Sequence, residues 1–558
     1  MTIANLSKFP LISTLLDMSD LDFALTQIRL NLVPLTPLDM TGIRDVQGMG
    51  NNIANPTWGA AYFPFLRLIP ANWGDSVTIN GVTYSPGNYA QGTVAMTDTM
   101  YGPIPTSLFG PPNPLNPLGI VLGNPNTYGT PTPTPLYETR GINIVDATPR
   151  EISNIVANSA GISQLLIQDN PATSPNGRVS PITGPDSPLP NSGFMALIGQ
   201  FFDHGIDFIH KGQGYILIPL LPGDPLYSNA PGALNFMVET RSLTVDPTTL
   251  LPSTSLNAAS TSINYASPYV DLSQAFGSDP SHTFFLKEYV LNTPGVAGFG
   301  HETGYLMSSS TGHLPTWADC KANAANVGIT LHDYNVINIP VVHNFGTSTN
   351  PSYLDANGQA WLEAKDTHGV LVLVQDTSLA KLSAAGLTLS CTGSAFIDDM
   401  ALSSVDPGAS LVAVPGTSGL MDGSYSADGD LTILENKQLL AAHYIAGDGR
   451  ANENYGLTSI HDVFHSEMNS IVNQIIALDE EKHLADPTYV QMTAEEIFQA
   501  AKLTTEMEYQ HMIFAEYARK LAPGIQNFIA YNPAVNAGID DAFADAVYRL
   551  GHSMLTET

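Results

Sequence analysis

The stretch that decides the fold is GQFFDHGIDF, residues 199–208. It continues the apolar run at 194–198, and its spacing predicts a buried helix over about residues 191–210. Gln200, Asp203 and His204 lie within that helix, although such groups are costly to bury without partners. Taken alone, His204 is an ordinary core histidine. An amide, an acid and an imidazole on neighbouring turns can instead line a polar pocket in which chemistry takes place.

Composition narrows the function classes. The chain has 558 residues, with 20 Lys and Arg against 51 Asp and Glu, so its formal net charge is −31. This charge argues against nucleic acid and anionic membrane surfaces as partners. Cys320 and Cys391 are the two cysteines, so there is no disulfide framework, although one bridge stays open. We expect no membrane span.

The N-terminus lacks the charged region and cleavage site of a signal peptide. We therefore expect either an extracellular protein that is exported without an N-terminal signal peptide or a cytoplasmic one.

The composition and the spacing of apolar residues change several times along the chain. Residues 1–45 predict an N-terminal arm with one helical piece, and residues 46–140 are rich in Pro and Gly. Helical spacing returns at 149–167, and short strands are expected over 212–280. In 281–435, GVLVLVQDTS (369–378), LTLSC (387–391) and ASLVAVPG (409–416) predict short strands in an inserted, peripheral section. After about residue 456 three helices are expected, the second with a capping box of Thr493 and Glu496 and the third running to the terminus.

Two further stretches combine polar groups with helix starts or apolar helices. GDGRANENYGLTSIH (447–461) holds Asp448, Arg450 and Glu453, which are either capping acids in a polar loop or an arginine over a polar site. In YRLGHSML (548–555), His552 is either a core histidine or a ligand to a metal or haem iron.

Two other groups of residues are of the types that ligate metal ions. SPYVDLSQAFGSD (267–279) forms either a turn or a small Ca²⁺ loop, with the ligands Ser267, the Tyr269 carbonyl, Asp271 and Ser273. His461 and His465 share one helical face. No Glu follows the first histidine and no third ligand is evident, so we expect no zinc there.

Together and in this order, these segments resemble the animal-type haem peroxidase family, within the peroxidase–cyclooxygenase superfamily. The similarity also includes GNNIANPTWGAAYFPFLRL (50–68), with Gly50 where mammalian members carry Cys, PREISNIV (149–156) and FADAVYRLGH (543–552). It covers about residues 46–280 and 440–558. The resemblance implies a mainly α fold, with a helical core around a haem and long Pro/Gly loops. It divides the chain into an arm (1–45), a first core part (46–280), an insertion (281–435) and a second core part (436–558).

The resemblance also implies a role for each matching residue. His204 would be the distal base, Arg450 would stabilise charge as the O–O bond of H₂O₂ breaks, and Gln200 would hold water or a halide. His552 would ligate the haem iron. Asp203 and Glu453 would form ester bonds to the haem. Because Asn454 follows Glu453 where a Met would be needed, no sulfonium link is expected.

Two departures from the family pattern matter. Gly205 replaces an aspartate that ligates calcium, so only its carbonyl is available, and Asp207 could supply another oxygen. The chain also stops six residues after His552, where family members continue with several helices. We therefore expect either a piece of a longer, bacterial-looking protein, with further domains beyond it, or a degenerate copy of the family.

Three functions remain open. The first is a peroxidase that uses H₂O₂ to oxidise a small substrate, namely a halide, a phenol or Mn²⁺. The second is a fatty-acid dioxygenase of the same superfamily, whose radical Tyr stands three residues before the proximal His; here that position is Arg549 and Tyr548 lies four before. The third is a non-catalytic, calcium-binding extracellular module that has lost haem.

Overall fold

The computed structural model describes residues 15–31, 46–67, 194–209, 227–230, 261–293, 296, 298–347, 351–398, 437–526, 531–549 and 551, and the strand backbones given below. Three sequence predictions lie outside these residues, namely the helix at 149–167, the strand at 409–416 and the histidine at position 552.

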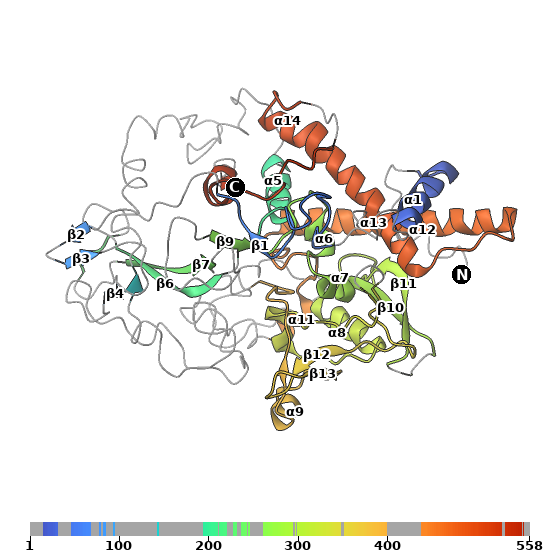
Figure 1. Cartoon of the computed structure of the whole chain (residues 1–558), viewed down its shortest axis with the longest axis horizontal. Coiled ribbons are helices and arrows are strands. Elements are labelled where there is room, and N and C mark those ends of the chain that lie inside the picture. The colour runs from blue at the N-terminus through green and yellow to red at the C-terminus, as the bar shows by residue number, and fades with distance from the viewer. Residues whose placement is uncertain are drawn as a thin grey trace.

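The described part is mainly α-helical, as predicted (Figure 1). Its α-helices are α1 (Met18–Asn31), α5 (Phe194–His204), α6 (Ser273–Phe276), α7 (Pro280–Leu286), α8 (Trp317–Asn326), α9 (Leu379–Ala384), α11 (Lys437–Ala442), α12 (Tyr455–Ala485), α13 (Ala494–His511) and α14 (Ala518–Leu521). Other helical turns are the 3₁₀-helix η3 (Asp333–Ile337) and the π-helices η4 (Met512–Tyr517) and η5 (Phe543–Val547).

The strands are short and form small antiparallel sheets. Three-stranded sheets join β1 (Phe63–Pro64), β9 (Thr261–Asn264) and β8 (Thr244–Val245), and β13 (Leu371–Val374), β12 (Leu362–Lys365) and β14 (Thr388–Leu389). The two-stranded pairs are β2 (Val77–Ile79) with β3 (Val82–Tyr84), β4 (Thr93–Val94) with β5 (Ile142–Asn143), β6 (Lys211–Pro219) with β7 (Phe236–Ser242), and β10 (Lys287–Leu291) with β11 (Gly300–Leu306).

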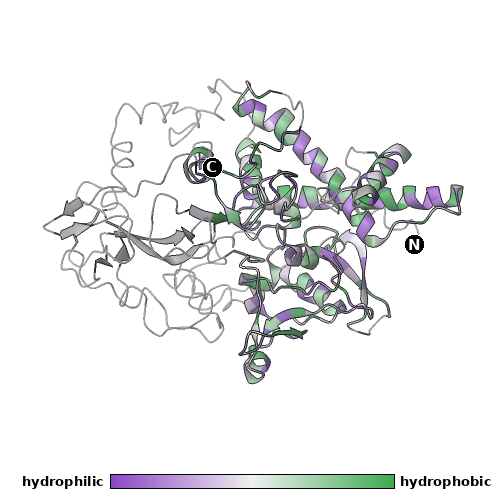
Figure 2. Cartoon of the chain, viewed as in Figure 1, coloured by the Kyte–Doolittle hydropathy of each residue, from purple (hydrophilic) through white to green (hydrophobic). Residues whose placement is uncertain are grey.

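Local sequence explains where the two long helices begin. The Asn454 side chain accepts a hydrogen bond from the backbone N–H of Leu457 and so caps α12. Thr493 and Glu496 form the predicted capping box at the start of α13. The first half of α12 is mostly buried, whereas polar residues recur along the end that projects from the core (Figure 2).

Helix α5 is fixed to α12 and α13 by aromatic side chains. Phe201 is fully buried and stacks on Phe464 with ring centroids 5.1 Å apart. Its edge contacts are His461 at 4.8 Å and Tyr509 at 5.9 Å. Aromatic packing of this kind adds to the free energy of area burial and restricts rotation of the helix. The polar residues of α5 therefore have a fixed orientation.

The section at 281–435 is only partly peripheral. Its described part contains the predicted short strands, and β12–β14 lie at one edge of the molecule with α9 (Figure 1). Phe284, Phe285 and Trp317, however, are at most 2% exposed and belong to the same core cluster as Phe276 and Phe498. Alternation of apolar residues shows that strands form, but it does not show which core they join.

The C-terminal segment and the two cysteines differ from the regular helix and the bridge that the sequence allows. The helix expected from about 539 to the terminus is a short π-helical turn, η5, followed by a 3₁₀ turn in the described residues. Cys320 and Cys391 are free thiols, so the open bridge is not formed. Among the described helices, none is both long and apolar enough to cross a membrane.

Candidate active site

Helix α5 brings Gln200, Asp203 and His204 to its C-terminal end. Gly199, just before them, permits the close approach of Tyr517, because a Cβ at position 199 would lie 2.5 Å from the Tyr517 hydroxyl oxygen. The Tyr548 hydroxyl donates to the Gly199 carbonyl at 2.9 Å. Tyr517 of the π-helix η4 and Tyr548, which follows the π-helix η5, thus both contact the helix that carries the polar residues.

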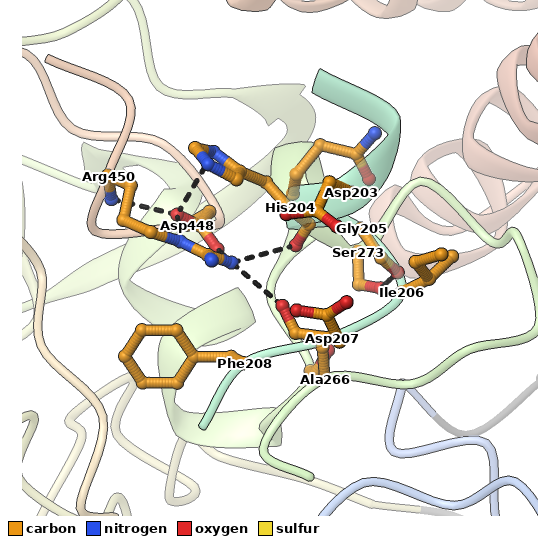
Figure 3. Close-up of polar contacts among 12 residues, drawn as sticks. Asp203, His204, Gly205, Ile206, Asp207, Phe208, Ala266, Ser273, Asp448 and Arg450 are labelled. Carbon is orange, nitrogen blue, oxygen red and sulfur yellow. Dashed lines mark hydrogen bonds and ion pairs between the residues drawn. The ribbon is translucent and has the colours of Figure 1, made fainter. Parts of the chain in front are cut away.

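His204 lies at the centre of the site and is 5% exposed (Figure 3). Its Nδ1 is 3.8 Å from Asp448 Oδ1 and its Nε2 is 3.7 Å from Glu453 Oε2. Burial, reinforced by Arg450, lowers the pKa of His204 well below its usual value, and Asp448 only partly offsets this. The imidazole is therefore neutral near pH 7 and can accept a proton.

Arg450 is held by four oxygens. Its Nε and Nη2 donate to the two carboxylate oxygens of Asp448 at 2.9 and 2.7 Å. Nη2 also donates to the carbonyls of Asp207 and His204, at 3.0 and 3.4 Å, and the guanidinium lies 4.8 Å from the centre of the Phe208 ring (Figure 3). Nη1 has no hydrogen-bond partner among the described residues, so its N–H groups are available to an incoming anion.

Asp448 forms the other half of this pair. Burial alone would raise its pKa, but Arg450 and His204 hold the pKa of Asp448 well below its usual value. The carboxylate is therefore ionised throughout the physiological range.

Glu453 lies on the Nε2 side of His204, and the Gln200 side chain interacts with Glu453. Asn454 donates from Nδ2 to Gln200 Oε1 at 2.9 Å. The Glu453 side chain is 39% exposed, and burial raises its pKa although Arg450 and Gln200 oppose that shift. The site thus combines a neutral base, a fixed cation, an amide and a carboxyl group within two segments about 250 residues apart in sequence.

Asp203 points to the C-terminal segment. Its Oδ2 accepts a hydrogen bond from Arg549 Nη1 at 2.9 Å, while its Oδ1 is buried without a hydrogen-bond partner among the described residues. Asp207 is 1% exposed, with Oδ1 3.8 Å from Arg549 Nη2. Burial and the neighbouring Asp203 raise the pKa of Asp207 to about 8. Arg549 therefore shares its charge between two acids of the α5 segment.

The predicted calcium loop brings oxygens together. The Ser267 and Ser273 hydroxyls donate to the two oxygens of Asp271 at 2.6 and 2.9 Å. The Ser273 hydroxyl also lies 3.0 Å from the Gly205 carbonyl and 3.2 Å from the Ser267 carbonyl. Tyr269 is anchored by its hydroxyl, which donates to the Trp58 carbonyl at 2.5 Å.

The backbone and the charge of this loop are unusual. Val270 and Leu272, on either side of Asp271, have φ values of 57° and 58°, a strained conformation for such side chains. Burial raises the pKa of Asp271 to about 6, although the Lys502 ammonium opposes the shift. The loop is therefore held in a strained shape that directs oxygens towards a carboxylate whose charge is incompletely balanced.

The structure leaves no space for an aspartate side chain at position 205, where the sequence has Gly205. A Cβ at position 205 would lie 2.1 Å from Gln274 Oε1. Gln274 is fully buried, and its Nε2 donates to the Phe201 carbonyl and to the Tyr509 hydroxyl, at 3.0 and 2.8 Å. The space for a side chain at position 205 is thus taken by an amide that cannot easily move. Asp207 does not hydrogen-bond to this loop among the contacts of the described residues.

His461 and His465 are both buried. His465 Nε2 is 2.9 Å from the Met307 carbonyl, whereas both ring nitrogens of His461 are buried without a hydrogen-bond partner in this part of the chain. Burial lowers the pKa of His461 to about 4. In the described ranges, no group of three or more His, Cys, Asp or Glu side chains could hold a metal ion.

The structure thus brings together the described residues predicted for the site, namely Gln200, Asp203, His204, Arg450 and Glu453. It also shows partners that sequence reasoning did not assign. Asp448 is two residues before Arg450 and resembled a capping acid. In the sequence, Asn454 is notable only because it stands where a Met would be needed. Arg549 is notable only because it stands where the dioxygenases have a Tyr. The spacing of Asp448 and Arg450 within GDGR could have suggested that these two residues pair.

Comparison with known proteins matches the C-terminal part of the chain. The sequence model of the family "Animal haem peroxidase" matches residues 418–558. The mouse (Mus musculus) protein "Peroxidasin homolog" is 33% identical over 112 residues, which are 20% of this chain and 7% of that protein. "Peroxidase mlt-7" of Caenorhabditis elegans is 31% identical over 133 residues, 23% of this chain and 17% of that protein. The matched region thus spans less than a fifth of the length of these curated relatives.

Among solved structures, "Peroxidase A from Dictyostelium discoideum" has a TM-score of 0.37 and 12% sequence identity, covering 91% of this chain and 59% of that one.

Proposed function

We propose that this chain, whose residues 418–558 match the animal haem peroxidase family, works as a haem-dependent peroxidase. The observation that carries the proposal is the pairing of a buried, neutral His204 with the fixed guanidinium of Arg450. Peroxide cleavage needs both a proton acceptor and a positive charge near the oxygen that leaves. Both groups lie in one site, on segments distant in sequence.

The residues present fit a haem. Asp203 Oδ1 is a buried polar atom without a hydrogen-bond partner among the described residues, which is typical of a site made to receive another group. His552 would supply the iron ligand, and Asp203 and Glu453 would attach the haem through ester bonds. When bound, haem would supply the redox centre at which peroxide is reduced and a second substrate is oxidised.

The side chains would manage the proton and the charge. His204 Nε2, on the side of Glu453, would accept a proton from H₂O₂ and return it to the leaving oxygen. Arg450 Nη1 would donate hydrogen bonds to that oxygen as its negative charge develops. Gln200, held by Asn454, would orient water or a halide beside them. The second substrate is then a small reductant that is a halide, a phenol or Mn²⁺.

Position 549 supports peroxidase over dioxygenase chemistry. Arg549 occupies the position where the dioxygenases place their radical tyrosine, and it donates to Asp203. Tyr548 is engaged elsewhere, with the Gly199 carbonyl and with the Tyr517 hydroxyl at 3.1 Å.

Calcium is the second proposed ligand. Ser267, Asp271, Ser273, the Gly205 carbonyl and the Tyr269 carbonyl would coordinate it. Oxygen donors of these kinds suit Ca²⁺, but a single carboxylate gives the site little charge, so affinity would be low. Export to the extracellular space, where Ca²⁺ is abundant, and further domains in a longer protein fit this proposal.

Replacing His204 tests the peroxidase activity. In haem-loaded protein, His204→Ala should slow the reaction with H₂O₂ by about 10²- to 10⁴-fold, because the general base is lost. Stopped-flow absorbance would measure the rate constant. His313→Ala is the matched control, since His313 is exposed and pairs with Asp462 outside the site. Equal rate constants for the two variants would rule out His204 as the base.

The ester bonds have their own test. After acid–organic extraction of denatured protein, wild-type chain should retain haem, whereas the double variant Asp203→Val, Glu453→Gln should release it. Release of all haem from the wild type would disprove the covalent attachment without touching the rest of the proposal.

A further inference from the structure

One carboxylate, that of Asp448, lies between the two groups that the proposed reaction uses (Figure 3). Its Oδ1 accepts hydrogen bonds from the backbone N–H and from Nε of Arg450, at 2.8 and 2.9 Å. Its Oδ2 accepts from Arg450 Nη2 at 2.7 Å. The same Oδ1 is 3.8 Å from His204 Nδ1. The Asp448 side chain is 9% exposed, so water screens these interactions little.

The contact with Arg450 fixes the orientation of the guanidinium. A two-point pairing of a planar guanidinium with a carboxylate restricts rotation, which a single hydrogen bond would not do. The carbonyls of His204 and Asp207 fix Nη2 further. Nη1 is the remaining nitrogen, and it has no hydrogen-bond partner in the part of the chain that the structure describes. Asp448 therefore determines which edge of Arg450 is presented to a ligand.

The contact with His204 bears on its tautomer. A neutral imidazole carries one proton, on either Nδ1 or Nε2, and the surroundings of each nitrogen decide between them. Nδ1 is buried and has no hydrogen-bond partner in the described residues, and the carboxylate nearest to it in the ion-pair geometry is that of Asp448. The negative charge of Asp448 beside Nδ1 favours the proton on that nitrogen. Glu453 lies at a similar distance from Nε2, but its side chain is 39% exposed against 9% for Asp448, so water screens the Glu453 charge more and the Asp448 charge decides. The lone pair then lies on Nε2, which faces Glu453 at 3.7 Å.

We propose that Asp448 is a positioning residue that fixes the guanidinium of Arg450 and selects the Nδ1–H tautomer of His204. This inference rests on the proposed function, because it assigns Nε2 as the atom that accepts the proton. Asp448 does not touch the substrate in this account. It acts through Arg450 and His204, so that one side chain sets both the base and the charge stabiliser.

The test replaces Asp448 with its uncharged isostere and observes His204 directly. In protein labelled with ¹⁵N-histidine and prepared without haem, the ring ¹⁵N shifts report the tautomer, and the His204 signals are assigned by their loss in His204→Gln. Wild-type protein should be predominantly Nδ1–H, and Asp448→Asn should change the ratio of tautomers several-fold towards Nε2–H. Asp462→Asn is the matched control, since Asp462 is also an aspartate beside a histidine, His313, but outside the site. It should leave His204 unchanged.

A second readout follows the reaction. Asp448→Asn should lower the rate constant for H₂O₂ by about 10²-fold or more, in the range expected when a general base is misoriented. Asp448→Glu, which keeps the charge, should restore the tautomer ratio.

Several outcomes would overturn the inference. An Nε2–H tautomer in wild-type protein would do so even if the Asn variant failed to fold, and so would an unchanged ratio in a folded Asp448→Asn. A purely structural aspartate would lower stability without moving the tautomer. The tautomer measurement needs neither haem nor peroxide. If wild-type protein kept Nδ1–H but did not react with H₂O₂, the proposed function would fail while the selection of the tautomer by Asp448 stood.

Discussion

The surroundings of Gly205 leave no room for a side chain. This single position lies at the junction between the candidate active site and the predicted calcium loop. Its carbonyl faces Ser273, and the fully buried amide of Gln274 fills the space where a Cβ would lie. The sequence showed that Gly205 departs from the family pattern but could not show what replaces the missing carboxylate. The replacement comes from residue 274, which is remote in sequence.

Gly205→Ala should destabilise the fold by about 1–3 kcal/mol, the usual cost of overpacking a well-packed core. Gln274 cannot move away cheaply because its amide already donates to Phe201 and Tyr509. Urea denaturation would measure the free energy of unfolding. Gly524→Ala is the control, since nothing lies within 4 Å of a Cβ there. Equal effects of the two substitutions would show that position 205 is not crowded.

The residues of the candidate site were mostly predictable, whereas their partners were not. Gln200, Asp203, His204, Arg450 and Glu453 stand in short motifs, and the resemblance of these motifs to a known family grouped them. The partners Asp448, Asn454 and Arg549 act through contacts across the fold. Such contacts depend on how α5 packs, and local spacing does not encode this packing.

At the scale of elements, the helices whose ends carry local signals were predictable. The capping box at Thr493 and Glu496 forms as expected. The π-helices η4 and η5 were not predictable, because a π-helical turn follows from tertiary contacts rather than from a pattern of side chains. Both carry or precede tyrosines that contact Gly199 on α5, which gives these irregular turns a role in positioning that helix.

The packing of α12 against α13 predicts a pH effect. Glu467 on α12 is buried, and burial together with Glu508 on α13 raises its pKa to about 7, above its unfolded value of about 4.5. The folded state thus favours the neutral carboxyl. The stability that this group contributes is fully present below about pH 4.5 and is lost as the pH rises through about 7.

Glu467→Gln should therefore make the fold more stable than wild type by about 1–2 kcal/mol at pH 8, with little difference at pH 4.5. Thermal unfolding across that pH range would show the divergence. Glu480→Gln, at an exposed position of the same helix, is the control. Parallel curves for wild type and Glu467→Gln would mean that the Glu467 carboxyl is not forced towards neutrality in the fold.

At the scale of the molecule, segments distant in sequence meet around α5. The segment at 46–67 packs on the predicted calcium loop, where Gly48 lies so close to Ser267 that a Cβ would be 2.7 Å from its hydroxyl oxygen. The loop contacts Gly205, and the segment at 447–454 contacts His204. The calcium loop therefore connects the N-terminal part of the chain to the candidate site, and a cation bound there would stabilise all three segments.

Removal of calcium should lower the melting temperature by several degrees, since a ligand that binds only the folded state adds to its stability. The comparison is between protein with millimolar Ca²⁺ and protein with EDTA. Asp271→Asn removes the single carboxylate among the proposed ligands and should abolish the difference. If the melting temperature is the same with Ca²⁺ and with EDTA, the loop is held by its own hydrogen bonds rather than by a cation.

The most direct test of the central claim is the absorption spectrum of the protein supplied with haem, before and after addition of H₂O₂. A Soret band should co-purify with the chain and shift within seconds of peroxide addition. In His204→Ala, the band should shift much more slowly. A protein that stays colourless despite ample haem, or a Soret band that peroxide does not move, would contradict the assignment of this site to peroxide chemistry.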